Sequence, residues 1–293
     1  MSTVMDEFHV LSRYKTDGDV GIEIEVEGRN LPMRVKYWNT EEDGSLRGLE
    51  TAEYVLKKPS TLVEAEMALK ELEDAYVLKD TVVDDSVRAG VHVHINSQDL
   101  TIIELYNFIT LYIVLEELLV KFCGEFREGN LFCLRSSDAD TVIRELQAAA
   151  RGGDFMRLVT DNLRYSSMNL KALGVYGSLE FRAMRGTRDL SLILQWARIL
   201  LNLREVAKTF QEPSEIIRRF SAGETDGFLQ KCLGDDLAPF IEMEGRKAML
   251  VSGMRRAQDV AFCCKWDKYN NTTIGGLEFP LGTEYPDEPL EDF

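Results

Sequence analysis

Hydrophobic and polar positions alternate strictly in the first well-patterned stretch of the chain, VGIEIEVE at residues 20–27. Successive side chains of a strand point to opposite faces, so this pattern predicts a half-buried strand with Val20, Ile22 and Ile24 on the buried face. The other face then carries a row of carboxylates. A solvated edge would tolerate such a row and a metal site would require one, so other parts of the chain must decide.

The rest of the first hundred residues is also rich in strand patterns. Strands are predicted over residues 32–38, 49–57 and 90–96. The Asp43–Gly44 pair between the first two is a hairpin or turn signal, so the chain is expected to reverse direction there.

Helical patterns begin at residue 61 and dominate the second half. The first helix starts where Thr61 and Glu64 form a capping box, and apolar residues follow at helical spacing up to Tyr76. Further helices are predicted over residues 99–123, over residues 138–150 with Ser137 or Asp138 as the cap, and over residues 189–208, and helical patterns continue to about residue 264. One strand is predicted among them, at residues 174–184.

These elements predict a single α+β domain, in which an antiparallel sheet is backed by helices. The domain is expected to span residues 18–279, with a helical part from about residue 210, after an N-terminal extension at residues 1–17. Residues 280–293 contain three prolines, several acidic residues and no basic residue, which predicts a mobile acidic tail.

Composition narrows the class of protein. The chain has 293 residues, of which 45% are hydrophobic, so it can bury a sizeable core. Its net charge of −16 disfavours an extended nucleic-acid-binding surface, which needs clustered Lys and Arg. No apolar run reaches the roughly 18 residues of a membrane span, and the N-terminus lacks a signal-peptide pattern. Five cysteines without a CxxC pair predict reduced thiols in an intracellular, cytoplasmic protein.

Four short polar motifs fall on or beside the predicted strands. Glu23 and Glu25 share one face of the first strand, about 7 Å apart along it. Asp43 follows in the turn, and Glu50 lies in the strand at residues 49–57. Each of these pieces alone fits a half-solvated strand or an ordinary turn as well as a metal site.

The other two motifs add histidines and arginines. His92 and His94 are two of only three histidines in the chain, and their i, i+2 spacing directs both imidazoles into one space, as a metal or phosphate site would use. Glu180 and Arg182 share a face of the later strand, with Arg185 shortly after them. By itself this pair also fits a cross-strand ion pair.

Carboxylates dominate this set, whereas zinc sites favour Cys and His. Hard cations such as Mg²⁺ or Mn²⁺ therefore fit better, and because Mg²⁺ keeps substrate phosphate oxygens in its shell, the set suggests a nucleotide site. The chain has no GxxxxGK[ST] loop and no GxGxxG motif after a strand. A nucleotide would have to be held by metals on a sheet together with arginines.

Six short pieces occur in the order typical of a known family. They are Gly21-Ile-Glu-Ile-Glu25, Asp43-Gly-Ser-Leu with Glu50, Ala89-Gly-Val-His-Val-His94, Arg164-Tyr with Asn169, Leu179-Glu-Phe-Arg182 running to Thr187, and Gln195-Trp-Ala. Over roughly residues 18–205 the chain resembles the amidoligases, small carboxylate–amine ligases of the glutamine synthetase and glutamate–cysteine ligase superfamily that are often found in phages and bacterial gene clusters. One departure is Ser86-Val-Arg-Ala ahead of the histidines, where many relatives carry cysteines.

The resemblance implies a curved antiparallel sheet that forms a half-funnel like that of the glutamine synthetase catalytic domain, with ATP at one mouth and the acceptor at the other. It also implies two or three Mg²⁺ or Mn²⁺ ions. Carried over by position, their ligands would be Glu23, Glu25, Asp43, Glu50, His92 and Glu180. Arg182 and His94 would lie at the ATP phosphates, Arg164 and Asn169 are candidates for phosphate or substrate contact, and Arg185 is a further candidate for cofactor contact.

The implied reaction is ATP-dependent amide formation through an acyl phosphate, from a small-molecule or peptide carboxylate and an amine. Because the chain is short, a monomer or a small homo-oligomer is expected, and the absence of a long apolar run predicts no membrane partner. Three other interpretations stay open: a phosphotransferase of the same fold, a catalytically inactive binding relative, and an adaptor whose acidic tail binds a partner.

Overall fold

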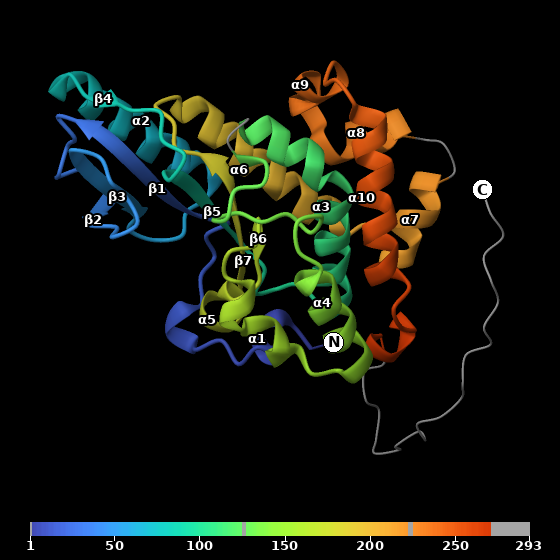
Figure 1. The fold of residues 1–293 in the computed structure, drawn as a ribbon. Coiled ribbons are helices and arrows are strands. Elements are labelled where there is room, and N and C mark those ends of the chain that lie inside the picture. The colour runs from blue at the N-terminus through green and yellow to red at the C-terminus, as the bar shows by residue number, and fades with distance from the viewer. Residues whose placement is uncertain (1, 125–126, 222–224, 271–293) are drawn as a thin grey trace.

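Helices back an open, seven-stranded antiparallel sheet in the computed structural model, which describes residues 2–124, 127–221 and 225–270 and confirms the α+β class (Figure 1). The strands follow the order β2-β3-β1-β5-β7-β6 across the sheet, and β4 pairs with the end of β1. Their bounds are β1 (Val20–Arg29), β2 (Trp38–Glu41), β3 (Glu50–Leu56), β4 (Val82–Val83), β5 (Gly90–Asn96), β6 (Met168–Asn169) and β7 (Ser178–Arg185).

Helices make up most of the other regular structure. They are α1 (Val4–Glu7), α2 (Leu62–Lys79), α3 (Ile102–Cys123), α4 (Thr141–Gly152), α5 (Ala172–Tyr176), α6 (Leu190–Ala207), α7 (Pro213–Ser221), α8 (Thr225–Leu233), α9 (Ala238–Ile241) and α10 (Arg246–Ala261). The capping box predicted at the start of α2 is present: the Glu64 N–H donates to the Thr61 hydroxyl, and the Glu64 carboxylate accepts the Thr61 N–H. Over the described ranges, no helix combines the length and the apolar character that crossing a membrane requires.

β1 lies inside the sheet and fixes which side chains share a face. It pairs with β3 from Glu23 to Gly28 and with β5 from Val20 to Ile24. The predicted alternation is confirmed, because Ile22 and Ile24 are buried on the helix-covered face while Glu23 and Glu25 point to the opposite face.

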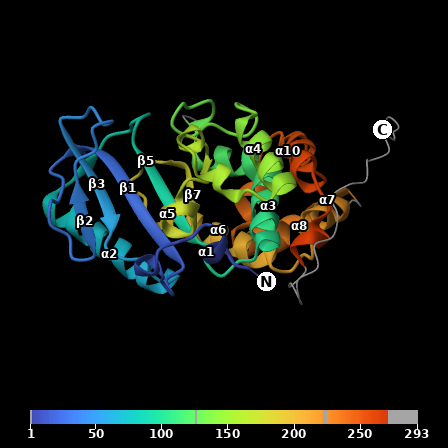
Figure 2. The same cartoon turned by 90° about the horizontal axis from the view of Figure 1, so that it is seen from below.

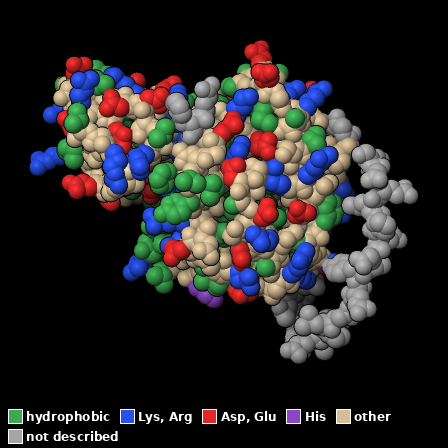
Figure 3. All heavy atoms as spheres, in the orientation of Figure 1, with side chains coloured by type: hydrophobic (Ala, Val, Ile, Leu, Met, Phe, Trp, Pro, Cys, Tyr) green, Lys and Arg blue, Asp and Glu red, His purple; other side chains and the backbone are tan. Residues whose placement is uncertain are grey.

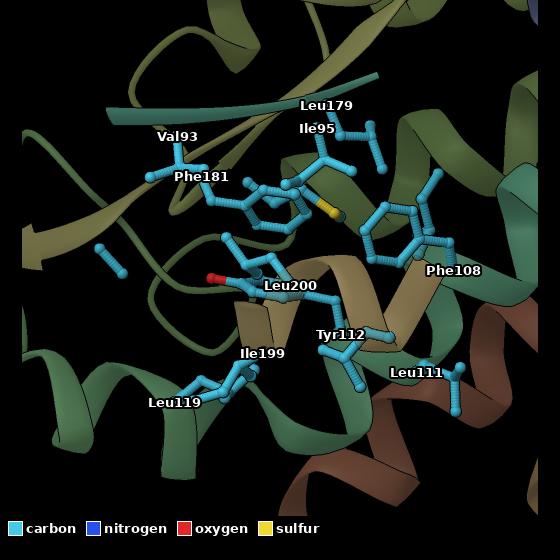
Figure 4. Packing of buried hydrophobic residues seen from close by; sticks show 14 of the residues in the cluster. Val93, Ile95, Phe108, Leu111, Tyr112, Leu119, Leu179, Phe181, Ile199 and Leu200 are labelled. Atoms are coloured by element: carbon cyan, nitrogen blue, oxygen red, sulfur yellow. The ribbon is translucent and has the colours of Figure 1, made fainter. Parts of the chain in front are cut away.

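Helices α2, α3 and α6 cover the apolar face of the sheet. Tyr54 of β3 packs edge-on against Tyr76 of α2. Figure 4 shows the Phe181 ring of β7 against Phe108 and Tyr112 of α3. Burying a large apolar side chain contributes roughly 1.5–3 kcal/mol. This packing therefore holds the sheet on its helices and leaves the opposite face to polar residues.

Helix α10 packs along α3 on the side away from the sheet, so that α3 is buried over most of its length (Figure 2). Where the two helices meet, a Cβ atom at Gly253 would lie 2.2 Å from the Val114 carbonyl oxygen. Only glycine fits at this approach.

Two strand predictions need correction. The strand predicted over residues 32–38 is wrong: the chain turns between Val35 and Trp38, where the Trp38 N–H donates to the Val35 carbonyl oxygen at 3.3 Å, and β2 begins only at Trp38. The strand predicted over residues 174–184 is wrong in its first part, which belongs to α5. That helix ends at Gly177 in the left-handed conformation, with φ of 67°, and β7 begins one residue later.

The cap predicted for α4 is also wrong. The helix begins at Thr141 with Asp140 in the cap position, because the Asp138 carboxylate is instead bound to the Arg135 guanidinium. The predicted acidic tail at residues 280–293 lies outside the described residues. The five cysteines are free, and four of them are buried. On the surface drawn in Figure 3, acidic and basic side chains are interspersed among the coloured residues.

Candidate active site

The face of the sheet opposite the helices gathers most of the polar residues of the four motifs. We call it the acidic face and define it by Glu23, Glu25, Asp43, Glu53, His92, His94, Glu180 and Arg182. Antiparallel pairing brings these residues together, because His92 lies opposite Glu23 and Glu180 lies opposite His94. Residues from distant parts of the chain thus meet on one surface.

Glu23, His94 and Glu180 form the first group on the acidic face. One possible ligand atom from each lies within 4.8 Å of the others. His94 Nε2 is 3.3 Å from Glu23 Oε1, and His94 Nδ1 is 3.2 Å from the Ser178 hydroxyl. Burial opposes ionisation of Glu23, but its hydrogen bonds with His92 and His94 outweigh burial and hold the pKa of Glu23 well below its usual value. Glu23 is therefore a carboxylate at neutral pH.

Glu25, Asp43 and Glu53 form the second group, again with ligand atoms within 4.8 Å of one another. Burial and then the charges of Glu23 and Glu25 raise the pKa of Glu53 to about 7. Burial likewise raises the pKa of Glu25. Asp43 joins them because the hairpin between β2 and β3 turns there, with Asp43 Oδ1 accepting the Ser45 N–H at 2.5 Å. Close carboxylates of this kind repel one another, and a bound cation would relieve the repulsion.

His92 lies between the two groups and is almost fully buried. Its Nδ1 is 3.1 Å from Glu23 Oε2 and 3.7 Å from Glu180 Oε1, and its Nε2 is 3.6 Å from Glu25 Oε1. Glu25 is also fixed by the backbone, because its Oε2 accepts the Gly90 N–H at 2.8 Å. One imidazole therefore contacts carboxylates of both groups and joins them into a single cluster.

Arg182 brings a positive charge to this cluster from β7. Its guanidinium forms an ion pair with Glu180, and its Nη1 lies 3.5 Å from His92 Nδ1. Asn169 of β6 donates to the other oxygen of Glu180 at 2.6 Å. Burial raises the pKa of Glu180, but the charges of His94 and Arg182 outweigh it, so the pKa lies below its usual value. Glu180 is thus held as a carboxylate.

Most of the strands that carry the cluster lie within the match to a known protein family. The model of a family described as the putative amidoligase enzymes matches residues 37–203, which is more than half of the chain. The chain belongs to this family. Membership confirms the resemblance read from the motifs and indicates an enzyme of the ligase type. A search of the curated proteins gave no match.

The amidoligase match begins just before β2 and ends within α6, so it includes Asp43, Glu53, both histidines of β5, and Glu180 with Arg182. Glu23 and Glu25 on β1 precede the matched range. They complete both groups in space, because β1 pairs with β3 on one side and β5 on the other.

Three of the site residues predicted from the sequence lie apart from the cluster. Glu50 begins β3 three residues before Glu53, so it points to the opposite face, and its Oε2 accepts the Leu31 N–H at 3.0 Å. Arg164 is exposed, with its guanidinium 5.5 Å from the centre of the Tyr165 ring. Arg185 ends β7, and within the described part of the chain no hydrogen bond or ion pair joins it to the cluster.

Two residues at the site lie outside the motifs recognised in the sequence. Glu53 shares the strand period of the acidic face, but only the register that sets it opposite Glu25 reveals its place. Arg127 is buried, and its Nε and Nη2 donate to the carbonyl oxygens of Ala183 and Arg182 at 3.0 and 2.6 Å. It therefore supports the strand that presents Arg182, and nothing in the local sequence signals this role.

Proposed function

We propose that this chain is an ATP- and Mg²⁺-dependent carboxylate–amine ligase that forms an amide through an acyl phosphate and releases ADP. The observation that carries the proposal is the single cluster in which His92 contacts carboxylates of both groups, with Arg182 beside it. Family membership supports ligase chemistry. The proposal includes a sheet that acts as a half-funnel of the glutamine synthetase type, with the acidic face as its inner wall.

Two or three Mg²⁺ or Mn²⁺ ions are expected, and the two groups of the acidic face would hold two of them. Hard cations of this kind prefer carboxylate oxygens. Glu23, His94 and Glu180 would hold one ion, and Glu25, Asp43 and Glu53 would hold the other, with Glu53 in the place expected for Glu50. The raised pKa of Glu53, caused by burial and by Glu23 and Glu25, fits a site built for a cation. Bound there, the ions would neutralise phosphate charge and align the reactants.

Arg182 is the side chain best placed to meet phosphate oxygens on this face. Its ion pair with Glu180 fixes the direction of the guanidinium before any ligand arrives. Asn169 holds the same carboxylate from its other oxygen, so Glu180 does not swing away from the arginine. An oriented donor of this kind stabilises charge that develops in the transition state without reorganising.

The proposed reaction has two steps. A carboxylate oxygen of the substrate attacks the γ-phosphorus of ATP, the bond to the β,γ-bridging oxygen breaks, and ADP leaves. The nitrogen of an amine then attacks the acyl carbon, the bond from this carbon to the phosphate oxygen breaks, and inorganic phosphate leaves as the nitrogen loses a proton. The acidic face would position the phosphates so that the first attack is in line.

Hydroxylamine trapping tests this proposal directly. The protein is incubated with ATP, Mg²⁺, hydroxylamine and a panel of amino acids and short peptides, and hydroxamate and ADP are measured together. We expect equal amounts of hydroxamate and ADP with the correct carboxylate, and much slower formation of both products by Arg182→Ala. A stable phosphorylated acceptor without hydroxamate would instead identify a phosphotransferase, and no ADP with any acceptor would argue for an inactive relative.

A further inference from the structure

A pocket of about 410 Å³ opens beside the first group, at the end of the sheet where β1 begins. Glu23 and His94 reach it from the acidic face, and Tyr14, Val55 and Tyr176 line it with apolar surface. Its volume falls within the range of small-molecule sites. The pocket therefore continues the proposed active site toward one edge of the sheet.

The N-terminal segment at residues 13–19 forms one wall of this pocket and is held there by two amide side chains. Gln98 Nε2 donates to the carbonyl oxygens of Tyr14 and Tyr176, at 2.8 Å each. Asn96 Nδ2 donates to the carbonyl oxygens of Thr16 and Gly18 at 3.2 and 3.0 Å. This wall precedes the range matched by the family model, so it is a feature of this chain beyond the family match.

Two glycines shape the pocket: one lets its wall pack against the neighbouring chain, and the other leaves its interior free of a side chain. A Cβ at Gly18 would lie 2.4 Å from the carbonyl group of Pro59, so glycine is needed where the wall meets the end of β3. Gly21 shares the face of Glu23, and a Cβ there would lie 3.4 Å from His94 Cβ, which is an ordinary contact. A larger side chain at Gly21 would thus project into the pocket without disturbing the strand.

The rim of the pocket is positively charged although the chain is strongly acidic. Arg13 and Lys15 line it, and neither has an ion-pair partner among the described residues. The Arg13 guanidinium lies 4.9 Å from the centre of the Tyr14 ring. Lys58 also lines the pocket but is paired with Glu64 at 3.4 Å.

Two acids line the pocket as well. Glu23 is engaged by His92 and His94, which leaves Asp19 as the acid opposed to the two free cations. The balance at the rim therefore favours an anion.

Arg182 does not line the pocket. A nucleotide whose phosphates meet Arg182 would leave the pocket to the other substrate.

We propose that this pocket binds the carboxylate substrate, and that the substrate is an acid with an aromatic or branched apolar body and a second anionic group. The apolar body would lie against Tyr14, Tyr176 and Val55, and the second anionic group would meet Arg13 and Lys15. The reacting carboxylate would then face Glu23 and His94. The placement of the reacting carboxylate rests on the proposed function, whereas the apolar and anionic contacts do not.

Binding of 3-phenylpropanoate, whose single carboxylate stands in for the second anionic group at the rim, is measured by calorimetry without Mg²⁺ and ATP and tests the pocket apart from turnover. Its uncharged counterpart is 3-phenylpropanamide. We expect the acid to bind the wild-type protein more tightly than the amide does. The double variant Arg13→Gln/Lys15→Gln should weaken binding of the acid roughly tenfold and leave binding of the amide unchanged. Gly21→Val should abolish binding of both. The double variant Arg29→Gln/Lys70→Gln removes two exposed cations outside the pocket and should change nothing.

Any other result of the binding measurement overturns the proposal. Equal binding of acid and amide, or equal loss in the two double variants, would show that the rim does not select an anion. Competition by adenosine would identify the pocket as the nucleoside site. If the acid binds as expected but hydroxylamine trapping fails, the pocket assignment stands and the proposed ligase function does not.

Discussion

Glu25 and Glu53 lie directly opposite each other in the antiparallel pairing of β1 with β3, on the same face of the sheet. With Asp43 they place three carboxylates within 4.8 Å, where burial and neighbouring charge raise the pKa of Glu53 to about 7. Like charges held this close repel one another, which costs folding free energy. Under the proposed function, a cation bound between these carboxylates would offset that cost.

Replacement of Glu53 by Gln should weaken Mn²⁺ binding, whereas Glu50→Gln should not. Glu53 belongs to the second group, while Glu50 points to the other face and binds the Leu31 N–H. Loss of one ligand should cost at least about 10–100-fold in affinity, the effect of losing a supporting partner. Calorimetric titration with Mn²⁺ compares the two variants. A loss confined to Glu50→Gln would restore the assignment expected from the motif.

Stability of the metal-free chain should fall as pH rises from about 4.5 to about 7. Glu53 has a pKa of about 7 in the folded chain against an ordinary value of 4.5, because it is buried beside Glu23 and Glu25. The folded state therefore holds more protons in this window, and deprotonation favours unfolding. Urea unfolding on either side of the window should show this slope in the wild-type protein and a flatter one in Glu53→Gln. An identical slope in both would remove Glu53 as its source.

Arg182→Ala should lower the rate of ADP release by about 10²–10³-fold, the usual effect of removing one oriented donor to a transition state. Arg164→Ala is the matched control, because this arginine is exposed beside Tyr165 and away from the acidic face. Rates are measured with saturating ATP and Mg²⁺, and thermal unfolding checks that both variants fold. Equal rates for the two variants would contradict the role given to Arg182.

His92→Asn should weaken binding of the first and the second metal ion together. The imidazole contacts Glu23 and Glu180 of the first group and Glu25 of the second, so its loss loosens both. His9→Asn is the control: His9 is exposed with φ of 53°, and Asn adopts this conformation readily. Mn²⁺ titration should show two weakened steps only in His92→Asn. One weakened step would place His92 in a single group.

Gly253→Ala should destabilise the fold by about 1–3 kcal/mol, the range for overpacking a close contact. Its added methyl would meet the Val114 carbonyl oxygen at 2.2 Å and push α10 away from α3. Gly227→Ala in α8 meets no atom within 4 Å and should be neutral or stabilising by about 0.5–1 kcal/mol. Urea unfolding compares the two free energies. Equal effects would show that α10 is free to shift.

The sequence by itself determined the features that depend on neighbours along the chain. Strand alternation at residues 20–27 placed Glu23 and Glu25 on one face, and the capping box at Thr61 began α2, because period and capping act within a few residues. The same local pattern directed His92 and His94 into one space. It failed where the chain turns, between Val35 and Trp38 and at Gly177.

Only the tertiary structure decided which acids meet. The register between β1 and β3 sets Glu53 rather than Glu50 opposite Glu25, and shifting that register by one residue would exchange the two faces. The place of Arg127 behind β7, and of residues 13–19 as a pocket wall, depends on partners more than fifty positions away. Such contacts arise from packing of the whole chain, which no local pattern contains.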